Sequence, residues 1–274
     1  MKLLAPKATE LPDIAIGAGL IAGTANVIMQ LARPGVGYGV VESKVDSGNL
    51  FKHPIKRTRT TLTYLAVATS GSEEERKAYR RGVNRSHARV RSSEDSPVSY
   101  NAFDPDLQLW VAACIYQGFS DVYRLFGVPV DPETWERLYR ESATLGTTLQ
   151  VPADRWPEDL AAFDRYWNEQ LDKVEIDDTV RAYLTDLIML TPFVPPVRLV
   201  FARLNRFLTT GFLPQRFRDE MRLDWSDRRQ QRFEQLMALL GVVVRHSPTI
   251  LRAFPFNALM VDLRWRIRTG RPVV

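Results

Sequence analysis

Apolar residues recur at helical spacing along most of the chain, whereas the alternation typical of strands is scarce. Helix start signals punctuate the pattern, most clearly where an aspartate precedes a proline at Asp104-Pro105 and Asp131-Pro132. The spacing predicts about ten helices. They cover residues 14–32, 55–69, 73–91, 104–126, 131–146, 197–209, 227–244 and 256–268, with two more beginning near residues 156 and 177. We therefore expect an all-α protein.

The chain shows no domain linker, so we expect residues 1–274 to form a single domain with a loose lead-in over residues 1–12. Residues 14–32 carry no charge and are long enough to span a bilayer. Their glycines and polar side chains favour a buried core helix instead. Glycines 35, 37 and 39 then predict a loop.

The two helices over residues 55–69 and 73–91 contain the most informative polar residues. Arg57 and Thr61 lie four residues apart and share a helix face. Ser72 and Glu75 form a capping box, and from there Tyr79, Val83, His87 and Val90 recur at helical spacing. A guanidinium, a hydroxyl and an imidazole would then face one apolar interior, which suits an anionic cofactor with a metal that accepts nitrogen. The alternative is that His87 is an ordinary core histidine.

Composition is that of an ordinary soluble globular protein, with 45% hydrophobic and 25% charged residues. The net charge of +5 comes with no nucleic-acid-binding signature, so we expect no nucleic acid partner. Cys114 is the single cysteine, which excludes an internal disulfide and fits the cytoplasm, and it lies in an apolar run. Arginines interleaved with Trp265 and Ile267 make the C-terminal helix compatible with an anionic membrane surface, although a solvated helix end is the ordinary interpretation.

One competing motif suggests a dinucleotide-binding oxidoreductase. Gly17, Gly19 and Ala22 match the G-x-G-x-x-A pattern, and Glu42 lies near the position of a ribose-binding acid. No alternating strand–helix pattern follows, so the small residues more readily allow a close helix or cofactor contact.

The order of several motifs resembles the oxygenase family typified by fungal MpaB and bacterial latex-clearing protein, and the likeness spans roughly the whole chain. The motifs are P-I-K-R-T-R-T-T-L-T-Y-L from Pro54, H-A-R-V-R from His87, Y-N-A-F-D-P-D-L-Q-L-W-V from Tyr100, F-D-R-Y-W from Phe163, G-F-L-P from Gly211 and L-R-A-F-P from Leu251.

The resemblance implies a b-type haem whose axial ligand is His87, with Arg57 and Thr61 beside it. It also implies a catalytic base upstream, for which Glu42 lies in about the right region. The sequence departs from the family twice. Latex-clearing members have a lysine where this chain has Thr60, and many relatives have a histidine where it has Arg33, a second candidate cation for the haem edge.

What the resemblance implies, then, is dioxygen activation at haem iron and oxygenation of an apolar, isoprenoid-type substrate. A haem carrier or sensor without turnover is the first alternative, and the dinucleotide enzyme is the second. The expected partners are a small apolar substrate and dioxygen.

Overall fold

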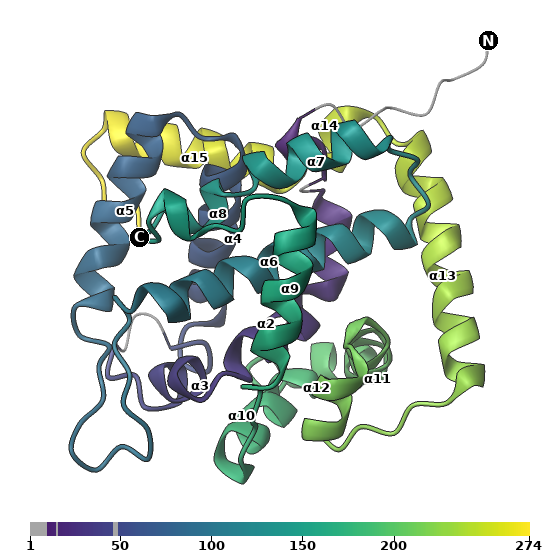
Figure 1. Ribbon diagram of the computed structural model, residues 1–274, viewed down its shortest axis with the longest axis horizontal. Helices are drawn as coiled ribbons and strands as arrows, with labels where there is room; N and C mark the ends of the chain where they lie inside the picture. Colours follow the sequence, from purple (N-terminus) through teal and green to yellow (C-terminus); the bar gives the residue numbers. More distant parts are fainter. Residues whose placement is uncertain (1–9, 15, 46–48) are drawn as a thin grey trace.

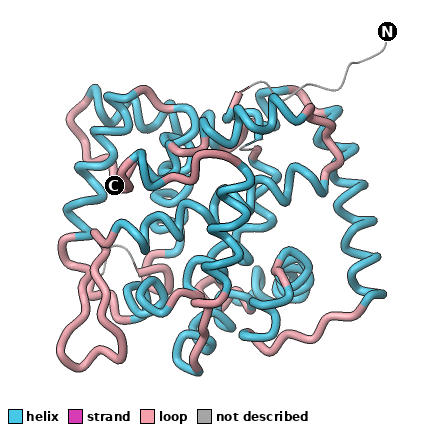
Figure 2. The backbone as a smooth tube through the Cα atoms, viewed as in Figure 1, coloured by secondary structure: helices cyan, strands magenta, loops and turns pink. Residues whose placement is uncertain are grey.

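The computed structural model describes residues 10–14, 16–45 and 49–274, and this part of the chain is helical without a strand (Figures 1 and 2). The predicted all-α class is confirmed. The helices are α1 (Leu11–Ile14), η1 (Gly17–Ala22), α2 (Gly23–Leu31), α3 (Pro34–Val41), α4 (Pro54–Ser70), α5 (Glu73–His87), α6 (Pro105–Leu125), α7 (Pro132–Glu141), α8 (Thr144–Thr147), η3 (Ala153–Arg155), α9 (Leu160–Leu171), α10 (Asp178–Ile188), α11 (Pro195–Phe212), α12 (Gln215–Glu220), α13 (Asp227–His246), α14 (Thr249–Arg252) and α15 (Phe256–Arg268).

Helix α6 passes through the middle of the molecule, and the other helices pack around it (Figure 1). The carboxylate of Asp104 caps its first turn by accepting from the backbone N–H of Asp106 at 2.8 Å, as the start signal predicts. Its Trp110 is fully buried and stacks on Trp167 of α9 at 5.2 Å between ring centroids. Cys114 of the same helix is fully buried.

The N-terminal segment differs from the single helix predicted over residues 14–32. It forms α1, the 3₁₀ helix η1 and then α2, with Ala15 outside the described residues. A Cβ atom at Gly17 would overlap the carbonyl oxygen of Phe254, so this glycine lets the chain before α15 pack against η1. No strand precedes the glycines of the G-x-G-x-x-A pattern in the described residues, and the strand–turn–helix context of a dinucleotide site is missing.

The predicted loop at glycines 35, 37 and 39 is wrong, because these residues form α3. Pro34 occupies the first helical turn, where its missing N–H costs nothing. A Cβ atom at Gly37 would lie 2.6 Å from the carbonyl oxygen of Leu31, so glycine here allows α3 to fold closely against α2. The glycines therefore serve helix packing rather than a turn.

Other boundaries shift for local reasons. The predicted helix over 73–91 ends at His87, which leaves Val90 outside it. Residues 1–9 of the predicted lead-in lie outside the described residues, and Leu11 and Pro12 belong to α1. The short helices α12 and α14 were not predicted, and Gly211 lies in the last turn of α11. Within the described residues, no helix has the length and apolarity needed to cross a membrane.

Candidate functional site

Helices α4 and α5 lie side by side and hold the predicted site residues. Pro54 starts α4, and the backbone N–H of Arg57 donates to the carbonyl of His53 at 2.9 Å in the first turn. The hydroxyl of Tyr79 on α5 donates to the carbonyl of Thr60 on α4 at 2.5 Å. This bond fixes the rotation of α5 relative to α4, and so fixes which residues of the two helices face each other.

Helix α5 is anchored at its start as well as along its side. The predicted capping box is present, with Glu75 N–H donating to the Ser72 hydroxyl and Ser72 N–H donating to the Glu75 carboxylate. The same carboxylate pairs with Arg264 of α15 at 2.7 Å, and this contact is the largest cause of the lowered pKa of Glu75. Arg80 donates to the carbonyls of Thr147 and Thr148 beyond α8.

His87 is the last residue of α5, and its ring packs edge-on against Phe103 at 6.2 Å between centroids. The loop that brings Phe103 there is closed by an antiparallel bridge between Arg91 and Asn101. The Nδ1 atom of His87 is buried and has no hydrogen-bond partner. Burial, and secondarily the charge of Arg57, lower the pKa of His87 to about 4. The imidazole is therefore neutral at pH 7, the form that binds metals.

Arg57 has protein on some sides and solvent on others. Its side chain has solvent-exposed surface, and desolvation by the surrounding protein lowers the pKa of its guanidinium. Among the described residues no carboxylate pairs with it, whereas a desolvated cation ordinarily finds a counter-charge. The charge of Arg57 contributes to the lowered pKa of His87, so the two groups lie near each other.

The two threonines of the motif behave differently. The hydroxyl of Thr60 donates to the carbonyl of Lys56 at 3.0 Å, within its own helix. The hydroxyl of Thr61, one turn after Arg57 on the same face, is exposed and makes no hydrogen bond within the described part of the chain. Thr61 is thus available to a ligand beside Arg57, and Thr60 is not.

Two phenols complete the surroundings of Arg57, and the sequence analysis did not assign them to the site. Tyr79 of α5 and Tyr183 of α10 both interact electrostatically with the guanidinium, and burial raises the pKa of each. Tyr183 also contacts Phe51 edge-on at 4.9 Å. Tyr79 already belonged to the predicted inward stripe of its helix, but Tyr183 is so distant in sequence that no local pattern could associate it with α4.

Glu42 and Arg33 lie apart from this group. The Glu42 carboxylate accepts from the hydroxyls of Ser96 at 2.7 Å and Tyr100 at 2.8 Å. Arg33 donates to the side chain of Gln170 and lies over the ring of Trp110, 5.8 Å from its centroid. No interaction between described residues joins either side chain to Arg57 or His87. Arg57 thus interacts with His87 and shares a helix face with Thr61, whereas Glu42 and Arg33 interact with other residues.

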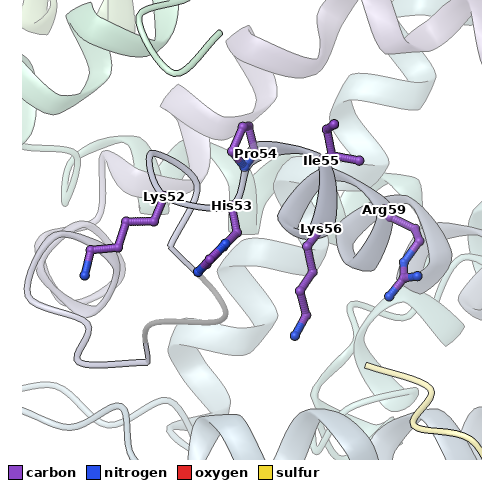
Figure 3. Close-up of a pocket in the computed structure, with 6 residues that line it drawn as sticks. All are labelled: Lys52, His53, Pro54, Ile55, Lys56 and Arg59. Carbon is purple, nitrogen blue, oxygen red and sulfur yellow. The ribbon is translucent and has the colours of Figure 1, made fainter.

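A separate hollow lies at the start of α4, with a volume of ≈ 500 Å³ (Figure 3). Figure 3 shows the side chains of Lys52, His53, Lys56 and Arg59 directed to one side, away from Ile55. Arg57, Thr61 and His87 are not among its lining residues. The hollow therefore marks the adjacent, cationic face of α4 and not the space before His87.

The donor set limits which kind of metal the site could hold. The described residues contain no cluster of three or more histidine, cysteine or carboxylate side chains. A metal at His87 would thus have one protein ligand and would need its other ligands from a cofactor, as haem iron does. An unpaired guanidinium nearby suits the carboxylates of such a cofactor.

In the described residues, fold and site together give an all-helical protein in which a neutral imidazole lies near a guanidinium that no carboxylate pairs. A family model described as "ER-bound oxygenase mpaB/B'/Rubber oxygenase, catalytic domain" matches residues 14–242. The chain belongs to this oxygenase family. Uncharacterised proteins of Mycobacterium bovis and Mycobacterium tuberculosis are each 50% identical to it over 256 residues, covering 93% of this chain and 100% of the relative. No solved structure matches.

Proposed function

We propose that the protein is a haem b-dependent oxygenase that acts on a small apolar substrate, with isoprenoid alkenes as the candidate class. One observation carries the proposal: the guanidinium of Arg57, which no carboxylate pairs, lies near the neutral imidazole of His87, whose buried Nδ1 has no hydrogen-bond partner. A group that carries both carboxylates and a nitrogen-accepting metal would satisfy the two at once. Family membership supplies the reaction class, oxygenation.

In this proposal His87 would hold the iron through a ring nitrogen, and its Nδ1 is a buried nitrogen without a hydrogen-bond partner. Arg57 would hold a propionate, and the hydroxyl of Thr61 would donate to a propionate or to another bound ligand. When bound, the haem supplies dioxygen activation at its iron. The helices would contribute ligation through His87 and charge neutralisation through Arg57.

Proton transfer is the least supported role. Glu42 is the family-derived candidate for the base, but its Oε2 accepts from two hydroxyls of the loop before α6. Those bonds tie the Glu42 carboxylate to the loop that contains Ser96 and Tyr100. Glu42→Gln should therefore reduce turnover if the carboxylate is the base, and should leave turnover unchanged if Ser96 and Tyr100 only hold a structural carboxylate.

The decisive experiment is the absorption spectrum of purified protein reconstituted with haem. Wild type should show a Soret band that His87→Ala removes or shifts strongly. His246→Ala is the matched control, because His246 is an exposed histidine on α13 and its loss should change nothing. A Soret band that survives His87→Ala with unchanged position would refute ligation by His87.

Turnover separates the enzyme from a haem carrier or sensor. The carrier has one observation in its favour, since Thr60 replaces the lysine of latex-clearing members and uses its hydroxyl within α4. Oxygen consumption with squalene or polyisoprene, together with a carbonyl product, would support the oxygenase. A stable oxygen complex without product would support the carrier.

A further inference from the structure

The helices α11, α13 and α14 expose large apolar side chains that the proposed function does not use. On α11 Leu199 is 86% exposed and Phe201 is 50% exposed, and on the α14 side Leu251 is 65% and Phe254 is 60% exposed. Further exposed members are Val200, Leu204, Leu239, Val242, Val243 and Ile250. We call these residues the α11–α14 surface. Exposed apolar side chains normally occur singly, so a group of this size indicates a binding surface.

The helices that carry this surface are linked by contacts, since α11 packs against α13 and both α11 and α14 pack against η1. The residues of η1 are themselves apolar and half-buried. Asn205 of α11 accepts from the hydroxyl of Thr24 just after η1, and Phe201 lies one turn earlier on the same helix face. The carbonyl of Phe254 sits against Gly17 at the other end of η1. Helix α13 lies along one edge of the molecule and leads directly into α14 (Figure 1).

The charges on this surface have one sign. Residues 187–218 and 235–261 contain no aspartate or glutamate. Helix α11 also carries exposed arginines between its apolar residues, at Arg198, Arg203 and Arg206. None of them forms an ion pair among the described residues. An apolar face with flanking unpaired arginines is typical of elements that lie in the interface of an anionic bilayer.

A second copy of the chain is a poorer occupant. In a twofold dimer each copy presents the same patch, so the arginines of α11 would face those of the partner copy without a carboxylate between them. Anionic lipid headgroups supply the missing negative charge, and the acyl chains supply the apolar phase. We propose that the α11–α14 surface docks the protein on an anionic membrane surface, with Leu199 and Phe201 inserted below the headgroups.

This surface differs from the C-terminal helix considered in the sequence analysis. Arg264 of α15 pairs with Glu75, Arg266 of α15 pairs with Asp262 at 2.7 Å, and Arg271 after the helix lies over the ring of Trp265. Val261 of α15 is nevertheless 66% exposed, so it offers a control substitution of similar exposure outside the proposed surface.

The test is flotation of the full-length protein with vesicles of phosphatidylcholine alone or with added phosphatidylglycerol. We expect binding to the anionic vesicles that weakens strongly at about 1 M salt, where charges are screened within about 3 Å. Leu199→Ser/Phe201→Ser should raise the apparent Kd at least tenfold, and Ile250→Ser/Leu251→Ser, a second variant should the first misfold, should do likewise. Val261→Ser should bind as wild type.

Three results would overturn the proposal. They are no binding to either kind of vesicle, binding that both double substitutions leave unchanged while circular dichroism shows them folded, and a stable dimer of the wild type that the double substitutions convert to monomer. None of these results depends on haem, so they can refute membrane docking without refuting the proposed oxygenase.

Discussion

The substitution Arg57→Met separates the role of Arg57 in the fold from its role in binding. The change removes the charge and keeps a long apolar side chain. Lys56→Met on the next residue is the matched control, because Lys56 is exposed on the adjacent face of α4. If the guanidinium serves to bind an anionic ligand, its removal should raise the free energy of unfolding of the cofactor-free protein.

The size of the effect follows from the surroundings of Arg57. Removing an unpaired buried charge can relieve several kcal/mol, but water reaches this side chain, so we expect a gain of only ~1 kcal/mol in the free energy of unfolding. In a domain of this size such a gain raises Tm by about 2–4 °C. Lys56→Met should stay within about 0.5 kcal/mol of wild type.

Urea unfolding of the cofactor-free protein measures the change in stability. Thermal unfolding with added haem then measures the change in haem binding. A ligand at a hundred times its Kd stabilises the folded state by about 2.7 kcal/mol. We expect the full haem shift in wild type and Lys56→Met, and a roughly tenfold lower haem affinity in Arg57→Met because a charge-assisted bond is lost. A cofactor-free Arg57→Met protein less stable than wild type by more than about 1 kcal/mol would show that the fold itself satisfies the guanidinium, and would refute the reasoning.

Three further predictions concern folding. Gly17→Ala should cost about 1–3 kcal/mol in urea unfolding, since its Cβ atom would overlap the Phe254 carbonyl, whereas Gly23→Ala meets no atom within 4 Å and should be neutral or stabilising. The lowered pKa of His87, about 4, means that the unfolded state binds the proton first, so stability should fall as pH drops from about 6.5 to 4, and His87→Gln should remove that part of the slope. Glu75→Gln removes the ion pair with Arg264 and weakens the capping box. Because the pKa of Glu75 is lowered, the ~1 kcal/mol that its carboxylate contributes to the free energy of unfolding should be present near neutral pH and be lost in acid.

The sequence predicts those parts of the fold that rest on local chemistry. The cap residues Ser72, Asp104 and Asp131 start helices where expected, because an N-cap bond depends on three or four neighbouring residues. The face shared by Arg57 and Thr61 was equally predictable, since it follows from helical spacing alone. Their roles toward haem stay predictions until a spectrum tests them.

The remainder depended on contacts between distant segments. Glycine is a loop signal when read locally, and only the approach of the Leu31 carbonyl explains why Gly37 lies in a helix. The association of Tyr183 with Arg57 depends on how α10 packs and has no local signature. The α11–α14 surface could not be predicted for the same reason. An apolar helical stripe in a sequence normally indicates a buried face, and only the packing of the other helices shows that this one is exposed.

The burial of Cys114 in α6 has a practical consequence. Burial raises the pKa of this thiol well above its usual range, so the side chain is neither ionised nor reachable by maleimide reagents in the folded protein. The native sequence therefore already serves as a background without reactive thiols. A single cysteine introduced at Leu199 would carry the only fluorophore, and its emission would report directly on the polarity around α11.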